Sequence, residues 1–173
     1  MATDGVVQFV ARDSAHGDEL WRSDGTSTGT TLVADLWPGE VGSRPMPLGA
    51  VAGGTMFFTA DTPGLSSNLF SDDGFGAGPE LVKRYTPTDP LEWDAPYPFR
   101  FAASGTSAFF WGHHGETLEY VWATDGTTAG TVRVGGPWST QQSSRHQLVL
   151  GDALLYDADV SGCGRELQKA ILP

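Results

Sequence analysis

Five residues, Gly25 to Gly29, match the G-x-S-x-G pattern that surrounds the nucleophilic serine of many hydrolases. In those enzymes the serine lies on a sharp turn between a β-strand and an α-helix. Here the segment lies between two stretches that we expect to be β-strands. Where the surrounding sequence recurs, the position of Ser27 is taken by Gly76 and by Thr128. We therefore interpret Ser27 as a loop residue and predict no catalytic residue in this chain.

Acidic residues near the end of the chain could bind calcium, which takes six to eight oxygen ligands from carboxylates and carbonyls in flexible loops. The expected loop 157–166 contains Asp157, Asp159 and Glu166. It lacks the regular alternation of an EF-hand loop. We expect these side chains to stabilise turns, with a structural calcium ion as the alternative. The four histidines show no metal-binding spacing, and we predict no other metal or cofactor.

A twelve-residue segment recurs along the chain. ELWRSDGTSTGT begins at Glu19, YVWATDGTTAGT begins at Tyr120, and a more divergent copy, NLFSDDGFGAGP, begins at Asn68. Each copy has an aromatic residue, an aspartate three positions later and a glycine directly after it. These positions are Trp21, Phe70 and Trp122; Asp24, Asp73 and Asp125; and Gly25, Gly74 and Gly126. A period near fifty residues is typical of stacked supersecondary units.

We divide the chain into approximate units 6–53, 54–105 and 106–152 with a partial unit 153–173, all within a single repeat domain, 1–173. Short apolar runs bounded by Gly, Asp, Ser and Pro predict β-strands, and the Asp-Gly steps favour hairpins. In the first unit we expect strands around 6–12, 19–23, 30–35 and 48–53. The prediction is an all-β fold: a β-propeller-like array of four-stranded antiparallel blades, with about three and a half units. The recurring aromatic position would pack between neighbouring blades.

Composition and charge exclude several classes of partner. The net charge is −11, and Lys83 and Lys169 are the only lysines, which argues against binding to nucleic acid. No apolar run is long enough to insert into a membrane. The first residues lack the features of a signal peptide. A single cysteine, Cys163, makes an internal disulfide impossible.

Four tryptophans do not follow the recurring core position: Trp37, Trp93, Trp111 and Trp138. Trp37 precedes a proline and Trp138 follows one, so we expect both in the turn after the third strand of a unit. Their flat apolar faces could bind sugar rings, as in propeller lectins. Alternatively, they cover a blade edge or a subunit contact.

A Pro-rich insertion spans residues 86–98, with Trp93 and Tyr97 inside it and Tyr85 directly before it. Insertions into a repeat lie in loops, often on the binding face. We therefore predict a ligand-binding site that includes these three aromatic residues.

The string ELWRSDGTSTGTTLVADLWPG, from Glu19 to Gly39, resembles the ELWxxDGTxxGT repeat of large secreted bacterial proteins. The middle and last units depart from this pattern at Phe75, Pro79 and Gln168. The resemblance implies a β-propeller-like, non-enzymatic module that is extracellular or located at the cell surface.

We expect a non-catalytic binding or scaffolding module that recognises a protein or a carbohydrate ligand through its rim loops. The alternative is a propeller-scaffold enzyme, such as a glycoside hydrolase with paired carboxylates. Because an incomplete ring exposes sheet faces and strand edges, we also expect a homo-oligomer or a longer repeat array.

Overall fold

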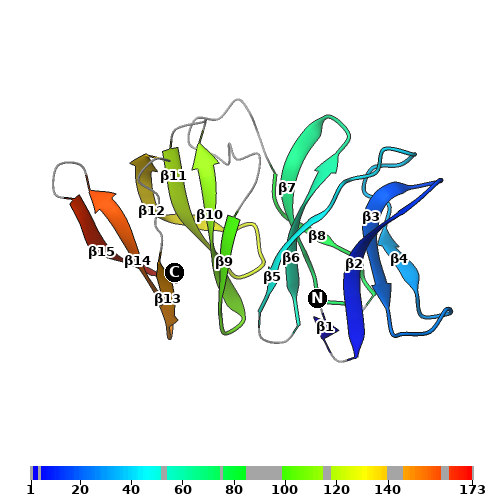
Figure 1. The fold of residues 1–173 in the computed structure, drawn as a ribbon, viewed down its shortest axis with the longest axis horizontal. Coiled ribbons are helices and arrows are strands. Elements are labelled where there is room, and N and C mark those ends of the chain that lie inside the picture. The colour runs from blue at the N-terminus through cyan, green and yellow to red at the C-terminus, as the bar shows by residue number, and fades with distance from the viewer. Residues whose placement is uncertain are drawn as a thin grey trace. The chain divides into compact units, whose positions relative to one another are not determined.

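The computed structural model describes residues 2–3, 5–51, 54–74, 76–84, 99–114, 118–139, 146–160 and 164–172 (Figure 1). These residues form β-strands joined by turns, and none of them is helical, which confirms the all-β prediction. Within this part of the chain there is accordingly no helix that could span a membrane. The chain divides into two compact units, residues 1–85 and 86–173, and each contains two antiparallel sheets.

The first unit contains two four-stranded sheets in which each strand pairs with the next along the chain. We call them sheets A and B. Sheet A consists of β1 (Ala2–Thr3), β2 (Val6–Asp13), β3 (Gly17–Ser23) and β4 (Thr31–Ala34). Sheet B consists of β5 (Met46–Ala50), β6 (Met56–Thr62), β7 (Leu65–Asp72) and β8 (Glu80–Lys83).

The second unit repeats this arrangement in sheets C and D. Sheet C consists of β9 (Phe99–Ser104), β10 (Ser107–His114), β11 (Leu118–Thr124) and β12 (Val132–Ser139). Sheet D has three strands among the described residues: β13 (Gln147–Leu150), β14 (Ala153–Val160) and β15 (Gly164–Ile171).

The strand that we expected to complete the first unit belongs to the next sheet. Residues 48–53 were predicted as a fourth strand beside 30–35. Instead, β5 pairs with β6, with Ala50 opposite Met56 and Met46 opposite Thr59. A short hairpin between β5 and β6 brings these strands together directly, whereas β4 and β5 are separated by residues 35–45. Each later sheet likewise begins with the strand that precedes its two long central strands.

The two central strands keep the same register in all four sheets. The opposed pairs are Phe9 and Trp21, Phe58 and Phe70, Phe110 and Trp122, and Tyr156 and Gln168. We call the face that carries these residues the aromatic face of each sheet. Because side chains alternate along a strand, the next residue pair points to the other face, which we call the aliphatic face. It carries Leu20, Leu69, Val121 and Leu167.

Within each unit, the aromatic face of the second sheet packs on the aliphatic face of the first. In the first unit, Phe58 and Phe70 of sheet B join Leu20 of sheet A in one buried cluster. The rings of Phe58 and Phe70 stack with their centroids 5.5 Å apart. In the second unit, Tyr156 of sheet D packs with Val121 of sheet C. Burying these apolar surfaces against each other is the main stabilising term for such a pair of sheets.

Trp111, which does not follow the recurring aromatic position, is one of the most buried residues of the second unit. It lies on β10 opposite Val121 and meets the ring of Tyr156 edge to face at a centroid distance of 6.0 Å. Phe110, its neighbour in sequence, is buried on the opposite face of sheet C. This strand is buried on both faces, so its core residues do not alternate with exposed ones.

Candidate functional site

In sheet A the loop that joins β3 and β4, residues 24–30, is organised around the carboxylate of Asp24. Asp24 Oδ1 accepts hydrogen bonds from the backbone N–H of Thr26 at 2.9 Å and from its hydroxyl at 2.7 Å. The hydroxyl of Thr26 accepts a bond from Gly29 N at 2.9 Å, and Thr30 Oγ1 donates to the carbonyl of Thr26. The hydrogen bond from the Thr26 hydroxyl lowers the pKa of Asp24. This aspartate is an ionised loop residue.

The same hydrogen bonds recur in sheet C, in the loop between β11 and β12. Asp125 Oδ1 accepts from the backbone N–H and the hydroxyl of Thr127, at 2.8 and 2.7 Å. Gly130 N donates to Thr127 Oγ1, and Thr131 Oγ1 donates to the carbonyl of Thr127. The hydrogen bond from Thr127 lowers the pKa of Asp125. Gly126 has a φ of 92°, a left-handed conformation that glycine adopts readily.

In the middle copy of the motif, an acidic side chain forms a hydrogen bond to the neighbouring sheet. Asp72, directly before Asp73 and Gly74, is buried and accepts a hydrogen bond from Gln8 Nε2 of sheet A. Burial raises the pKa of Asp72, and the hydrogen bond from Gln8 acts in the opposite direction. Arg22 reaches from sheet A to the carbonyl of Gly74 at 3.5 Å. In this copy the motif joins two sheets.

A cavity of about 260 Å³ lies beside the loop of sheet A and is lined by Arg22, Asp24, Thr28 and Gly74, among others. Arg22 is held there by a 3.2 Å bond from its Nε to Thr31 Oγ1. Ser27 is exposed in the same loop, and a strand follows it. The structure thus lacks the strand–helix turn that a nucleophilic serine of this motif requires.

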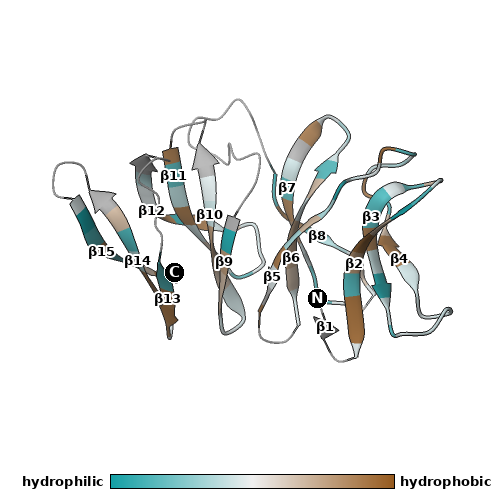
Figure 2. Ribbon diagram, viewed as in Figure 1, coloured by the Kyte–Doolittle hydropathy of each residue, from teal (hydrophilic) through white to brown (hydrophobic). Residues whose placement is uncertain are grey.

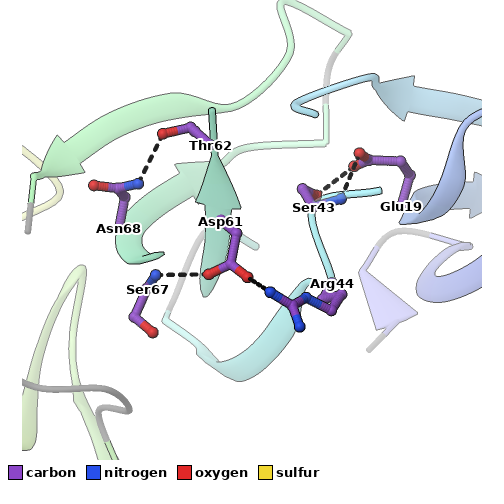
Figure 3. A network of polar contacts seen from close by, with 7 residues as sticks. All are labelled: Glu19, Ser43, Arg44, Asp61, Thr62, Ser67 and Asn68. Atoms are coloured by element: carbon purple, nitrogen blue, oxygen red, sulfur yellow. Dashed lines mark hydrogen bonds and ion pairs between the residues drawn. The ribbon is translucent and has the colours of Figure 1, made fainter. Parts of the chain in front are cut away.

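The opposite end of each sheet, where its two central strands are joined, carries a second group of polar residues. We call it the hairpin end. In sheet A, Glu19 is completely buried. Its carboxylate accepts hydrogen bonds from Ser43 N at 2.8 Å, Ser43 Oγ at 2.5 Å and Trp37 N at 3.1 Å (Figure 3). These donors satisfy both oxygens, which a buried carboxylate requires. Glu19 therefore anchors the connection between sheets A and B.

Sheet B continues this network with a second buried carboxylate, Asp61 (Figure 3). Asp61 Oδ1 accepts a bond from Ser67 N at 2.9 Å, and Oδ2 forms an ion pair with Arg44 at 2.5 Å. Arg44 has a φ of 50°, which is uncommon for a residue other than glycine. Next to this pair, the Asn68 side chain donates to Thr62 Oγ1 at 3.0 Å.

The β2–β3 turn of sheet A contains a partly exposed ion pair. Asp13 accepts bonds from the backbone N–H groups of Ala15 and His16 at 2.8 and 2.7 Å. Its other oxygen lies 2.8 Å from Nδ1 of His16. This contact raises the pKa of His16 and lowers that of Asp13. His16 is thus a paired residue at the edge of the hairpin end.

The hairpin end of sheet C contains a chemically distinct acid whose burial the sequence did not reveal. Glu119 lies on β11 and is buried. Burial raises the pKa of Glu119 to about 7, and the charge of Arg100 acts in the opposite direction. Arg100 lies on β9 and, like Arg44, has a positive φ, here 54°. Such an acid, half protonated near neutral pH, could donate or accept a proton.

Both tryptophans proposed as ligand contacts lie near a buried glutamate, but not in equivalent turns. Trp37 lies in the loop after β4, is partly exposed and donates its backbone N–H to Glu19. Trp138 lies inside β12, opposite Glu119 of β11. The prediction of a turn was wrong for Trp138 because β12 continues past Pro137 to Ser139. Trp93, Tyr85 and Tyr97 lie outside the described residues.

The expected calcium-binding loop is largely strand. Asp157 and Asp159 belong to β14, and Glu166 belongs to β15. Glu166 is opposite Ala158, so the side chains of Asp157 and Glu166 point to opposite faces of sheet D. Asp157 forms an ion pair with Arg165 and accepts a bond from His146 N at 2.8 Å. Among the residues that the structure describes, no three metal-ligating side chains come close enough to share an ion.

Comparison with known proteins supports the fold. No protein-family model matches the chain, and no curated protein matches it. Among solved structures, puromycin hydrolase aligns over 96% of this chain with 18% identity and a TM-score of 0.54. A puromycin-hydrolyzing peptidase from Mycobacterium tuberculosis aligns over 97%, with 15% identity and a TM-score of 0.54.

The chain spans about a quarter of these structures, 25% of the first and 26% of the second. TolB from Acinetobacter baumannii aligns over 96% of this chain and 41% of its own, with 16% identity and a TM-score of 0.48. The puromycin hydrolase and the puromycin-hydrolyzing peptidase have folds of the β-propeller type. At such identities the likeness concerns the fold alone. The chain is an all-β protein of β-propeller-like architecture.

Proposed function

We propose that this chain is a non-catalytic binding or scaffolding module that recognises a protein or a glycan through loops at the hairpin end of its sheets. The observation that carries the proposal is that the acidic side chains near the motif accept hydrogen bonds from the protein itself. Asp24 and Asp125 are each occupied by donors from their own loops, and Glu19 is occupied by donors from the connection between sheets A and B. Acids held in this way support the fold and are poorly placed to transfer protons to a substrate. We also propose that the chain is a member of the ELWxxDGTxxGT repeat proteins and acts outside the cell or at its surface.

The proposed ligand contacts are Trp37 and Trp138, together with Trp93 and Tyr97 of the insertion and Tyr85 directly before it. Trp37 supports this assignment best, because its indole is partly exposed while its backbone is fixed by the buried carboxylate of Glu19. A tryptophan with a fixed backbone offers a flat apolar surface at low entropic cost. Sugar rings and apolar protein side chains both bind such surfaces.

A glycan array, followed by affinity capture of proteins from an extracellular fraction, tests this proposal. We expect binding in one of the two assays and its loss in Trp37→Ala, which keeps the backbone N–H bonded to Glu19. Leu81→Ala is the matched control, because Leu81 is an exposed apolar residue at the other end of sheet B. No binding in either assay, or equal binding by Trp37→Ala and the wild type, would overturn the proposal.

One observation favours the alternative, an enzyme on a propeller scaffold. Glu119 has the raised pKa that a general acid of a glycoside hydrolase needs. Release of nitrophenol from aryl glycosides, abolished in Glu119→Gln with the fold intact, would support this alternative. No turnover by the wild-type chain would favour the binding module.

A further inference from the structure

The aliphatic face of sheet D and the aromatic face of sheet A resemble the two faces that meet in the contacts within each unit. Leu20, Val121 and Leu167 occupy the same position of the repeat, on the aliphatic face of sheets A, C and D. Leu20 and Val121 are completely buried, each under the aromatic face of the next sheet. Leu167 is 73% exposed. The contact that covers Leu20 and Val121 is absent at this position.

Other residues extend this exposed apolar surface across sheet D. Leu148 and Leu150, on β13, are 61% and 67% exposed. Figure 2 shows one end of β13 in the hydrophobic colour. Ile171, on β15, is 47% exposed. Isolated exposed apolar residues are ordinary, but several on one sheet face indicate an interaction surface.

The aromatic face of sheet A is the counterpart of this surface. Its pair Phe9 and Trp21 is only partly buried, whereas the equivalent pair Phe58 and Phe70 of sheet B is buried against sheet A. Val7, which lies two residues before Phe9 on the same face, is 45% exposed. Sheet A thus presents the kind of surface that covers an aliphatic face elsewhere in the chain.

We propose that the aliphatic face of sheet D binds the aromatic face of sheet A from a second copy of this chain, in a head-to-tail contact. The packing of sheet B on sheet A, and of sheet D on sheet C, is the template. Leu167 of one copy takes the place of Leu20, and Phe9 and Trp21 of the other take the places of Phe58 and Phe70. The contact is independent of the proposed ligand binding.

A polar group fits the same template. Lys169 lies two residues after Leu167, as Arg22 lies two residues after Leu20. Arg22 donates to the carbonyl of Gly74, in the loop of the following sheet. The equivalent of Gly74 in sheet A is Gly25. In the head-to-tail contact, Lys169 therefore reaches the Gly25 carbonyl of the second copy.

A contact between two different faces either closes into a ring or continues into a filament. We expect the smallest closed form, a dimer in which each copy uses both faces. Sedimentation velocity at increasing concentration should show a species of about twice the chain mass of 18.4 kDa.

Two variants and their mixture test the head-to-tail geometry. Leu167→Glu blocks the face of sheet D, and Val7→Glu blocks that of sheet A; both positions are exposed, so the fold should survive, as circular dichroism would verify. Each variant alone should be monomeric. A mixture of the two should form a 1:1 dimer, because one variant retains a free sheet A and the other a free sheet D. Val41→Glu, at an exposed loop position outside both faces, should dimerise like the wild type.

Three results would overturn the proposal. The first is a wild-type chain that stays monomeric up to about 100 µM, a concentration far above the Kd of specific protein contacts. The second is a dimer of Val7→Glu alone, which would indicate that sheet D binds another sheet D. The third is a folded Leu167→Glu variant that dimerises as the wild type does. None of these results bears on the glycan array or on protein capture.

Discussion

Gly130 lies so close to Asp125 that a Cβ atom at position 130 would stand 2.1 Å from Oδ1 of the aspartate. The same relationship holds between Gly29 and Asp24, at 2.0 Å. Neither glycine has a positive φ, so the requirement for glycine is steric. The second glycine of the repeat motif makes room for the carboxylate that organises the loop.

We therefore predict that Gly130→Ala destabilises the chain through Asp125. The added methyl group forces the carboxylate away from Thr127, and the loss of these bonds should cost about 1–3 kcal/mol. Urea denaturation gives the free energy of unfolding. In an Asp125→Ala background the same substitution should cost much less, because nothing remains for the methyl group to displace. Equal costs in both backgrounds would disprove the steric account.

The hydroxyl of Thr127 should stabilise the loop only while Asp125 is ionised. Thr127→Val preserves the shape of the side chain and removes its bonds to Asp125 and Gly130, so we expect a loss of about 1 kcal/mol at pH 7. Because the folded-state pKa of Asp125 is lowered, this stabilisation is present above its unfolded pKa and disappears as the pH falls through the folded value. The difference between wild type and variant should shrink in acid. Thr128→Val, at an exposed neighbouring position, is the control.

Ser43→Ala should be costly because it removes a hydrogen bond from a buried charge. Glu19 and Ser43 are both completely buried, and losing a donor to such a carboxylate should cost about 2 kcal/mol. Thermal or urea unfolding would measure the loss. Ser27→Ala, at an exposed position in the loop of the same sheet, should leave stability unchanged. A similar effect of both substitutions would contradict the role of Glu19 as a buried anchor.

Glu119 should make the chain less stable as the pH rises. Its folded-state pKa is about 7, against a usual value of 4.5, so the folded chain binds the extra proton between these values. The free energy of unfolding should therefore fall between about pH 4.5 and 7, by about 3 kcal/mol at most. Glu119→Gln should remove this fall and be the more stable protein at pH 8. A variant with the pH profile of the wild type would refute the assignment.

Local sequence signals predicted the strands well because strand formation in this chain follows short apolar runs. The pairing of β5 was missed because we divided the units after residue 53, although β5 lies closer to β6 along the chain than to β4. Trp111 was missed because a strand buried on both faces does not alternate. Its signal was the unbroken apolar run Phe109-Phe110-Trp111, which is typical of such strands.

The candidate site was predicted less completely than the fold. The alignment of the repeats placed Tyr120, not Glu119, at the position of Glu19. The pKa of Glu119 is unusual only because the residue is buried, and no local sequence pattern predicts that burial. We singled out Trp37 because a proline follows it. Its backbone hydrogen bond to Glu19 could not be predicted in this way, because it joins residues 18 positions apart through the loop after β4. Such contacts depend on the tertiary structure.

The most direct test of the role given to the motif aspartates is a titration of the side-chain carboxyls by ¹³C NMR. If Asp24 and Asp125 organise their loops, both should ionise below the usual range for aspartate, because the threonine hydroxyls two positions later stabilise the charged form. In Thr26→Val and Thr127→Val, each pKa should return towards its usual value. A pKa at or above the usual range for either aspartate in the wild-type chain would contradict the account.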